Sequence, residues 1–571
     1  MKEGRFEMSI MKVSEIPYKR YTIEEGREAF ARFEAAMQAA RSADDVIAAR
    51  KDFRFEVEIF ETAASLANCR FTLDTRDEFY QNEMNYYDEN GPLFSELSTN
   101  YGALMLASPY RAELEQKLNP RLFKMWENEQ KTFSPAVIED CQEENATVTE
   151  YSKLMSEMVF TFRNEDMPLS RLRGKLEDSD RAVRREAAEA IGRGLEKNAE
   201  ALDGLYDRLV KIRTRIAKKL GYESFTELGY YRMGRIDYDA EMVASFRENV
   251  RRSLVPRVKA IKEGIGRELM LDTFMFYDND IYGTGASIVP VLDKAGMFAA
   301  AERMYDAMDP EIGAFMREMQ VAEAFDVDAR DGKFGGGYCT IFNSYRQPFI
   351  LANFNGTTGD VDVLTHEFGH AFAMKKIYDR PDSELAIGGC ETAESHSMSM
   401  EFLSWPAMGD FFGEDADRYR RKHLLSALTF IPYGVMVDEF QHEVYARPEM
   451  TPEERKAVWR GLEEKYRPYL SYGDLPYLSE GTRWQYQMHI YETPFYYIDY
   501  CLAQTVAIGF LCASREDYAD ALARYIELCR AGGEKAFGQL IADAGLADPF
   551  TDGSLDVMAE KLMRVLTEIE G

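Results

Sequence analysis

Apolar residues recur at three-to-four spacing along most of the chain, a pattern that predicts a mainly α-helical protein. The stretch 24–66 is a clear example, because it is also rich in Ala, Glu and Arg, which favour helices. Two sites have the spacing of a capping box, Thr22 with Glu25 and Thr147 with Glu150, and each predicts the start of a helix.

The helical pattern is interrupted once, between residues 333 and 359. Two short β-type runs, YCTIF at 338–342 and PFILANF at 348–354, flank a polar turn, and the segment closes with the turn dipeptide Asn355-Gly356. We therefore expect a small hairpin that leads directly into the next helix.

The chain has 571 residues, more than a single simple core usually supports, so two or more lobes are expected. Near residue 175 the composition changes from Tyr-, Phe- and Asn-rich to Arg-, Ala- and Glu-rich, and a long helical pattern covers 170–220. We predict an N-terminal helical region over residues 1–175 and a second region over 176–571, which can also pack as one continuous unit.

Composition narrows the classes of function. Lys and Arg number 69 against 99 Asp and Glu, and the resulting net charge of −30 repels phosphate backbones, so no nucleic-acid partner is expected. The N-terminus has charges throughout and no apolar core, and the longest uncharged apolar run, 500–514, is too short to span a bilayer. The seven cysteines are scattered without CxxC spacing, which favours reduced thiols. We expect a cytoplasmic protein with no membrane partner.

The stretch VLTHEFGHAF, residues 363–372, holds two histidines four positions apart with a glutamate directly after the first. Asp360 is the expected N-cap of a helix here, and His366 and His370 then project from the same side of that helix. Two imidazoles at that pitch can both reach one tetrahedral Zn²⁺ at about 2.0–2.1 Å. Glu367 beside them is placed to accept a proton from a metal-bound water.

The alternative to a metal site is a polar stripe on a half-buried helix. With 6 His and 99 acidic residues in the chain, a chance H-[DE]-x-x-H is expected in only about one such chain in a hundred. Without a metal, each buried imidazole would also need another partner, at about 1–3 kcal/mol for each group left unsatisfied.

A third ligand must come from elsewhere in the chain. The three-histidine pattern HExxHxxGxxH is excluded, because Ala373 and Lys376 stand where it requires glycine and histidine. Downstream, GGCETAESHSMSMEFLSWP predicts a helix on which Glu391, Glu394 and Glu401 share one stripe. A glutamate ligand would complete a His₂Glu site with its fourth position open for water, the pattern of catalytic zinc.

The pair of motifs HEFGH and ETAESHSMSMEFL resembles the thimet oligopeptidase and oligoendopeptidase F family of zinc peptidases, and most closely the short bacterial branch that includes Pz-peptidase. The resemblance implies one Zn²⁺ per chain, with Glu394 of the Glu-x-x-Ser motif as the third ligand. Glu391, one turn earlier, and Asp362, one turn before His366, are the carboxylates expected to orient the zinc histidines, which usually donate their second N–H to such a group.

The segment MHIYETPFYYIDYCLAQ taken alone is typical of an aromatic-rich core helix. Members of the family carry a histidine followed by paired tyrosines here, which bind substrate and stabilise the tetrahedral intermediate. This resemblance implies those roles for His489, Tyr496 and Tyr500, with Tyr497 and Tyr491 as reserves, and Tyr497 is also a candidate for substrate binding.

Three consecutive glycines, Gly335 to Gly337, stand just before Tyr338 and the first β-type run. Glycines let a peptide backbone approach closely, and an exposed strand edge can pair with an extended peptide. The GGGY stretch also resembles a family element that lines the substrate cleft, so Gly336, Gly337 and Tyr338 are predicted to bind substrate; a purely structural turn is the alternative.

The resemblance covers roughly residues 175–565. It implies two helical lobes enclosing a deep substrate cleft, with a small β-sheet beside the zinc helix. The expected function is zinc-dependent hydrolysis of internal bonds in short, unstructured peptides. Two alternatives stay open: a zinc exopeptidase of another HExxH class, and a catalytically silent peptide-binding protein of the same fold. Glu367 argues against the second, because a pure binder has no use for a general base.

Overall fold

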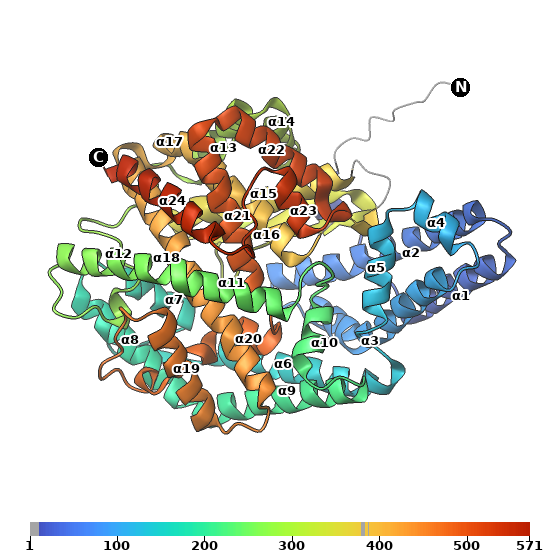
Figure 1. The fold of residues 1–571 in the computed structure, drawn as a ribbon, viewed down its shortest axis with the longest axis horizontal. Coiled ribbons are helices and arrows are strands. Elements are labelled where there is room, and N and C mark those ends of the chain that lie inside the picture. Colours follow the sequence, from blue (N-terminus) through green and yellow to red (C-terminus); the bar gives the residue numbers. More distant parts are fainter. Residues whose placement is uncertain (1–10, 379–382, 386–387, 571) are drawn as a thin grey trace.

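Helices make up most of the structure, which confirms the predicted mainly α-helical fold (Figure 1). The computed structural model describes residues 11–378, 383–385 and 388–570. The first helices project from one side of the molecule and are α1 (Ile23–Ala39), α2 (Ala43–Leu73), α3 (Glu78–Leu106), α4 (Arg111–Lys117) and α5 (Pro120–Glu129).

One of the two predicted capping boxes starts a helix. The Thr22 side chain accepts a hydrogen bond from the Glu25 backbone N–H, and the Glu25 carboxylate accepts one from the Thr22 N–H at 2.8 Å. The prediction for Thr147 and Glu150 was wrong, because both lie inside α6 (Ile138–Glu157). There the Thr147 hydroxyl donates to the carbonyl one turn back, 2.8 Å away, as threonines within helices often do.

The middle of the chain is also mostly helical. It is interrupted by the largely irregular segment 269–293 and by a short antiparallel hairpin that was not predicted, β1 (Phe160–Phe162) with β2 (Glu165–Met167). The helices of this part are α7 (Leu169–Gly174), α8 (Arg181–Glu196), α9 (Ala199–Lys219), α10 (Phe225–Arg232), α11 (Ala240–Ser253), α12 (Val255–Glu268), α13 (Lys294–Met308) and α14 (Pro310–Val321). The largest apolar cluster holds residues from both sides of position 175, such as Tyr151 and Ile191. The domain boundary at 175 stays a prediction.

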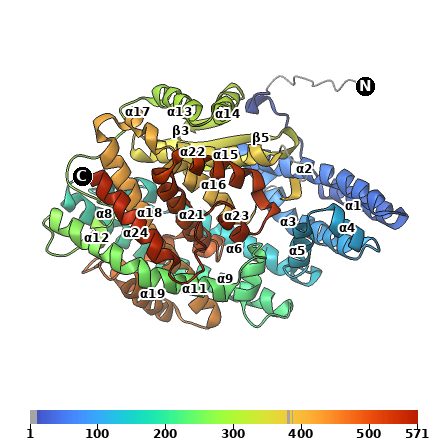
Figure 2. The ribbon, with the colours of Figure 1, turned by 45° about the horizontal axis from the view of Figure 1, so that its top comes forward.

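The second sheet contains the hairpin predicted from the β-type runs. Strands β4 (Tyr338–Phe342) and β5 (Gln347–Phe354) pair antiparallel. A third strand, β3 (Phe325–Asp328), was not predicted; it pairs parallel with β5, so the order is β3-β5-β4 and β4 lies at an edge. Figure 2 shows this sheet between helices α13 and α14 on one side and the next helix of the chain, α15, on the other.

Helix α15 (Thr358–Tyr378) carries the two histidines and begins immediately after the hairpin. Asp360 was expected as its N-cap, but the helix already begins at Thr358, so that expectation was wrong. The Asp360 carboxylate instead accepts hydrogen bonds from the backbone N–H groups of Asn355, at 2.9 Å, and Gly356, at 2.8 Å. Asp360 thereby fixes the turn that joins the sheet to the helix, which sets where the histidines project.

The C-terminal part of the chain supplies α16 (Cys390–Leu403), α17 (Met408–Phe412), α18 (Ala416–Ala446), α19 (Pro452–Tyr466), α20 (Met488–Glu492), α21 (Tyr497–Glu516), α22 (Tyr518–Ala531), α23 (Phe537–Asp543) and α24 (Ser554–Glu570). Among the described residues, α21 alone is long and apolar enough to cross a membrane, but 72% of that window is buried inside the protein, as in a core helix.

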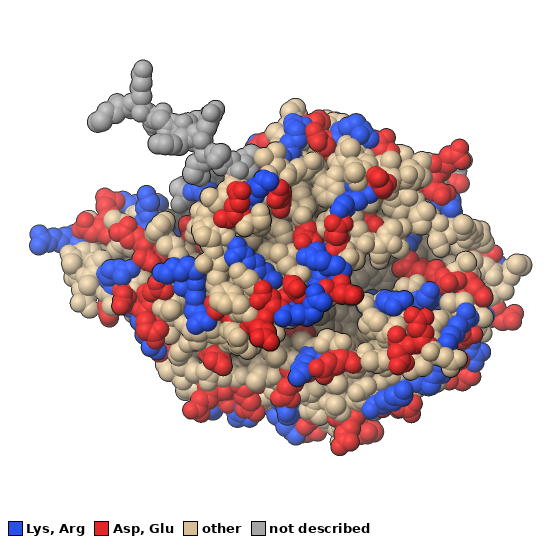
Figure 3. All heavy atoms as spheres, turned by 180° about the vertical axis from the view of Figure 1, so that it is seen from behind, with Lys and Arg blue, Asp and Glu red and all other residues tan. Residues whose placement is uncertain are grey.

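Two bodies of helices form the upper and lower parts of the molecule in Figure 1. Helices α13, α14, α22 and α24 belong to the upper part, α6, α8, α9 and α19 to the lower part, and α15, α16 and α21 lie between these groups. Figure 3 shows a deep hollow between the two parts on the opposite face. The predicted arrangement of two helical lobes around a cleft, with a small sheet beside the histidine helix, is confirmed.

Helices α15 and α16 approach each other closely at Gly369. A Cβ atom at this position would lie 2.8 Å from the His396 carbonyl oxygen and 2.8 Å from the Ser397 Cα. Backbone atoms cannot yield as a flexible side chain does, so only glycine permits this approach. Since Gly369 lies between the two histidines in sequence, the same contact sets the distance from their imidazoles to α16.

We therefore expect Gly369→Ala to lower the free energy of unfolding by about 1–3 kcal/mol, because the added methyl group forces the two helices apart. Urea unfolding measures the change. The matched control is Gly204→Ala in α9, where a Cβ would meet no atom within 4 Å and the gain in helix propensity should raise stability by about 0.4–1 kcal/mol. Equal stability of the two variants would contradict the close contact.

Candidate metal centre

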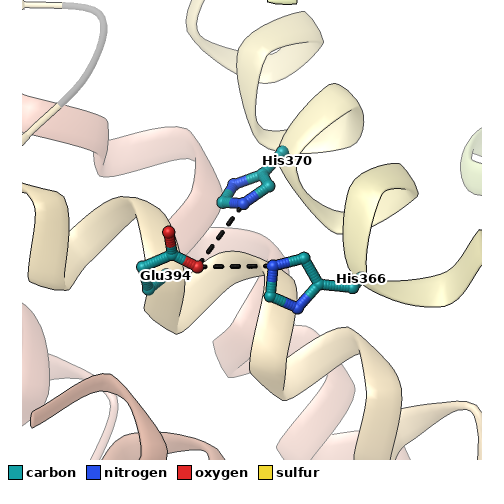
Figure 4. A group of neighbouring side chains, drawn as sticks. All are labelled: His366, His370 and Glu394. Carbon is teal, nitrogen blue, oxygen red and sulfur yellow. Dashed lines mark ion pairs between the residues drawn. The ribbon is translucent and has the colours of Figure 1, made fainter. Parts of the chain in front are cut away.

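Three potential metal ligands converge between α15 and α16 (Figure 4). The Nε2 atom of His366 lies 3.4 Å from Glu394 Oε2, and the Nε2 atom of His370 lies 3.5 Å from the same oxygen. One ligand atom from each of the three residues falls within 4.8 Å of the others. Figure 4 shows this carboxylate oxygen facing both imidazoles. The structure thus brings together the three residues predicted as ligands.

The spacing of these atoms fits a single zinc ion. Ligand atoms at about 2.0–2.1 Å from a tetrahedral Zn²⁺ are separated from one another by about 3.3–3.4 Å. The separations of 3.4 and 3.5 Å from the Glu394 oxygen match that value, so little movement is needed for both pairs to bind one ion. Two imidazole nitrogens and one carboxylate oxygen are also the donor set of catalytic zinc sites with an open position.

Charge is arranged to favour a cation at this point. Burial by itself raises the pKa of Glu394, but the imidazoles of His370 and His366 outweigh burial and hold that pKa well below its usual range. Burial lowers the pKa of His366, and the carboxylates of Glu394 and Glu401 outweigh it and hold the pKa well above its usual range. The cluster therefore keeps an ionised carboxylate inside the protein, and either a protonated imidazole or a metal cation can supply the positive charge that it needs.

Glu401 orients the first histidine, a role that the sequence did not assign to it. Its Oε1 atom lies 2.7 Å from His366 Nδ1, and its Oε2 atom lies 2.7 Å from His423 Nε2 on α18. The indole N–H of Trp405 donates in turn to His423 Nδ1 at 2.9 Å. This series of hydrogen bonds holds the His366 ring with its Nε2 atom toward Glu394. Glu401 shares a helical stripe with Glu394, and that periodicity was the available signal.

The two carboxylates predicted to orient the histidines have other partners. Glu391 accepts hydrogen bonds from the hydroxyl groups of Tyr238 and Thr392, each at 3.2 Å, and Asp362 accepts one from Tyr419 of α18. Neither carboxylate bonds to a zinc-motif histidine in the part of the chain that the structure describes. The prediction that Glu391 and Asp362 orient the zinc-motif histidines is therefore corrected. Glu391 faces the loop before α11 and Asp362 faces α18. Glu401 is the carboxylate that bonds to His366.

Glu367 is buried beside the candidate site, with 7% of its surface exposed. Burial raises the pKa of this carboxyl group above its usual value, an effect that the neighbouring imidazoles of His366 and His370 oppose. Gly337, the residue before β4, lies close by, since a Cβ there would be 3.8 Å from Glu367 Oε1. The glutamate thus lies between the histidines and the edge of the sheet.

The predicted histidine and tyrosines gather on the other side of Glu394. The His489 ring centroid lies 5.7 Å from those of Tyr496 and Tyr500 and 5.0 Å from that of Tyr497. The Tyr496 hydroxyl donates to Glu394 Oε1 at 2.9 Å, so this tyrosine is tied directly to the third candidate ligand. Burial lowers the pKa of His489 to about 4, which keeps its imidazole neutral at physiological pH.

The reserve assignment of Tyr491 is contradicted. Its ring is fully buried and stacks on Tyr151 at a centroid distance of 3.9 Å, and its hydroxyl donates to the Leu202 carbonyl at 3.2 Å. Tyr491 is therefore a core residue between α6 and α9. Tyr491 lies two residues after His489 on the short helix α20, so the two side chains project from different sides of that helix.

The glycine stretch forms the approach to β4. The Asn353 side-chain amide donates to the carbonyls of Phe334, at 2.8 Å, and Gly336, at 2.9 Å, which fixes the turn. The Tyr338 hydroxyl lies 2.6 Å from Thr72 Oγ1 of α2, so this ring spans from the sheet to the N-terminal helices. A Cβ at Gly335 would meet no atom within 4 Å.

Comparison with known proteins identifies the fold and the family. Residues 13–133 match the peptidase M3 N-terminal domain and residues 303–560 match peptidase family M3. The chain is 24% identical to oligopeptidase PepF of Bacillus subtilis over 567 residues, covering 87% of this chain and 78% of that protein. It is 42% identical to PZ peptidase A, solved with an inhibitor, with a TM-score of 0.94 and coverage of 97% of this chain and 99% of that one.

A Bacillus anthracis protein provisionally assigned as an oligoendopeptidase F is 37% identical, with a TM-score of 0.89 and 98% of each chain covered. Identity of this extent over nearly whole chains confirms the family resemblance that the HEFGH and ETAES motifs predict. The chain belongs to peptidase family M3.

Proposed function

We propose that this protein is a zinc-dependent oligoendopeptidase that hydrolyses internal bonds of short, unstructured peptides. The observation that carries the proposal is the convergence of His366, His370 and Glu394 at zinc-ligand spacing beside the buried Glu367. The relatives are named oligopeptidase, Pz-peptidase and oligoendopeptidase F, which supports the same activity. All seven cysteines are free thiols, in keeping with the proposed location in the cytoplasm.

His366, His370 and Glu394 would hold one Zn²⁺ per chain, and Glu401 would keep the His366 ring in its binding orientation. A zinc ion in such a site supplies Lewis acidity and lowers the pKa of its water to about 7. Glu367 is the general base: it accepts a proton from the attacking water and then passes that proton to the leaving amine.

The oxyanion of the tetrahedral intermediate needs hydrogen-bond donors in addition to the metal. Tyr500 and His489 fill this role. Tyr496 is less suited to it, because its hydroxyl already donates to Glu394. Burial raises the pKa of Tyr500, so its hydroxyl keeps its proton and can donate throughout the physiological pH range.

The substrate backbone would lie along the edge of β4. This strand pairs with β5 on one side only, and an extended peptide can add to such an edge through main-chain hydrogen bonds. Gly336 and Gly337 allow the backbone to approach Glu367 closely, while Tyr338 and Tyr497 would contact substrate side chains. The hollow in Figure 3 is the route by which we expect an extended peptide to reach the site.

Cleavage of a peptide blocked at both termini, with and without a chelator, tests this function. An endopeptidase cuts such a peptide internally and loses activity when zinc is removed. An exopeptidase needs a free terminus and leaves it intact, and a silent peptide-binding protein leaves blocked and free peptides intact alike.

Removing a residue that only hydrogen-bonds to a metal ligand typically weakens metal binding by about 10–100-fold. Glu394→Ala removes a ligand itself, so it should weaken zinc binding by more than about 100-fold. Zinc content after dialysis and competition with a chelator measure the effect. Glu391→Ala is the matched control, because this residue bonds to Tyr238 and Thr392 instead, and it should retain zinc. Zinc loss in the control alone would reassign the third ligand.

Glu367→Gln should retain the metal and lose turnover, because the amide has nearly the shape of the carboxylate but cannot accept the proton. The measurement pairs zinc content with kcat on a blocked fluorogenic peptide. A zinc-loaded variant with the kcat of the unmodified enzyme would remove Glu367 from the reaction.

Tyr500→Phe should lower kcat by about 10²–10³-fold, the cost of removing one oxyanion donor. Tyr497→Phe serves as the control, since its ring lies in the same cluster, 5.6 Å from that of Tyr500, and it should alter KM rather than kcat. If Tyr500→Phe changes only KM, this tyrosine binds the substrate and does not stabilise the intermediate.

A further inference from the structure

Gln487 links His489 to a tyrosine of α18 through its side-chain amide. The amide Nε2 lies 3.0 Å from His489 Nδ1, and the amide Oε1 accepts a hydrogen bond from the Tyr433 hydroxyl at 2.7 Å. The Tyr433 ring is itself held in place by two guanidinium groups, since Arg483 lies 5.0 Å and Arg467 lies 5.4 Å from its centroid.

The chemistry of the amide decides which nitrogen of His489 carries the proton. An amide NH₂ group can only donate a hydrogen bond, so His489 Nδ1 must accept one and cannot be protonated. A neutral imidazole then has its hydrogen on Nε2. Burial lowers the pKa of this ring to about 4, so the neutral form is present at physiological pH.

The reverse orientation of the Gln487 amide is disfavoured by Tyr433. Turning the amide over would place its NH₂ group against the tyrosine hydroxyl, and the hydroxyl proton would lose Gln487 Oε1, its one acceptor among the described residues. Tyr433 is half-buried against the core, and a hydroxyl that loses its partner there gives up a hydrogen bond worth about 0.5–1.5 kcal/mol. Tyr433 therefore selects the amide orientation, and the amide selects the tautomer of His489.

We propose that Gln487 and Tyr433 are positioning residues that hold His489 in its Nε2–H tautomer, so that this ring donates a hydrogen bond during peptide hydrolysis. The proposal rests on the proposed function and deepens it. No side chain of the described residues accepts from His489 Nε2, which leaves its N–H available beside Tyr496 and Tyr500. An imidazole in this state cannot act as a general base through Nε2, so proton abstraction is left to Glu367.

The tautomer can be read directly by NMR of the zinc-loaded protein labelled with ¹⁵N-histidine. The chain has only 6 histidines, and His489→Phe identifies the signals of this one by their disappearance. The proposal predicts a protonated Nε2 and an unprotonated Nδ1 in the unmodified protein. A protonated Nδ1 overturns it, whether or not the protein proves to be a peptidase.

Gln487→Glu tests the cause of the tautomer. A carboxylate at this position accepts hydrogen bonds at both oxygens, so it should draw the imidazole proton to Nδ1 while still accepting from Tyr433. We expect the ¹⁵N signals of His489 to change to the Nδ1–H pattern and kcat to fall roughly 10²-fold, with zinc content unchanged. Unaltered His489 signals in this variant would show that Gln487 does not set the tautomer.

A second pair of variants separates this role from a merely structural one. Tyr433→Phe removes the hydroxyl that selects the amide orientation, so it should give a mixture of the two tautomers and a smaller loss of kcat than Gln487→Glu. In the His489→Phe background, Gln487→Glu should lower kcat no further. An equal loss in both backgrounds overturns the proposal. Absence of zinc-dependent cleavage in the unmodified protein would instead refute the proposed function, and the NMR result would still stand.

Discussion

The site depends on the contact between α15 and α16 at Gly369. There, the backbone of one helix touches the backbone of the other, with no room for even a methyl group. This contact brings the Glu394 carboxylate between the imidazoles of His366 and His370, which lie on adjacent turns of α15. Helix packing therefore supplies the metal geometry, and a buried carboxylate that would otherwise be costly gains positive partners.

Two of the three candidate ligands, His366 and Glu394, are held by hydrogen bonds with other side chains. Glu401, itself bonded to α18 through His423, fixes the ring of His366. Glu394 receives one hydrogen bond from Tyr496, at 2.9 Å, and one from the Ser397 hydroxyl, at 3.1 Å. The side chains that would bind the metal and those that would stabilise the intermediate are thus joined in one hydrogen-bond network. A displacement of one set of side chains would therefore displace the other.

Much of this arrangement could be predicted from local sequence. The HEFGH spacing determines the side of the helix from which the histidines project, and the family resemblance points to Glu394 among the three glutamates of its stripe. Two short runs of β-type residues around a polar turn likewise predicted β4 and β5. These features depend on neighbours within a few positions, or on a motif that the family shares.

What local sequence could not supply is the identity of partners that come from distant segments. Helical periodicity places Glu391, Glu394 and Glu401 on one stripe, but whether each meets Tyr238 or a histidine depends on how other elements pack against it. Strand β3 is recognised only through its parallel pairing with β5, and Tyr491 belongs to the core through contacts with Tyr151 of α6 and Leu202 of α9.

Anomalous diffraction at the zinc edge from crystals of the metal-loaded protein tests the central claim most directly. The account predicts one strong peak per chain, about 2.0–2.2 Å from His366 Nε2, His370 Nε2 and a Glu394 oxygen. A peak elsewhere in the chain, or an ion at the two histidines with Glu394 outside its coordination sphere, would contradict it.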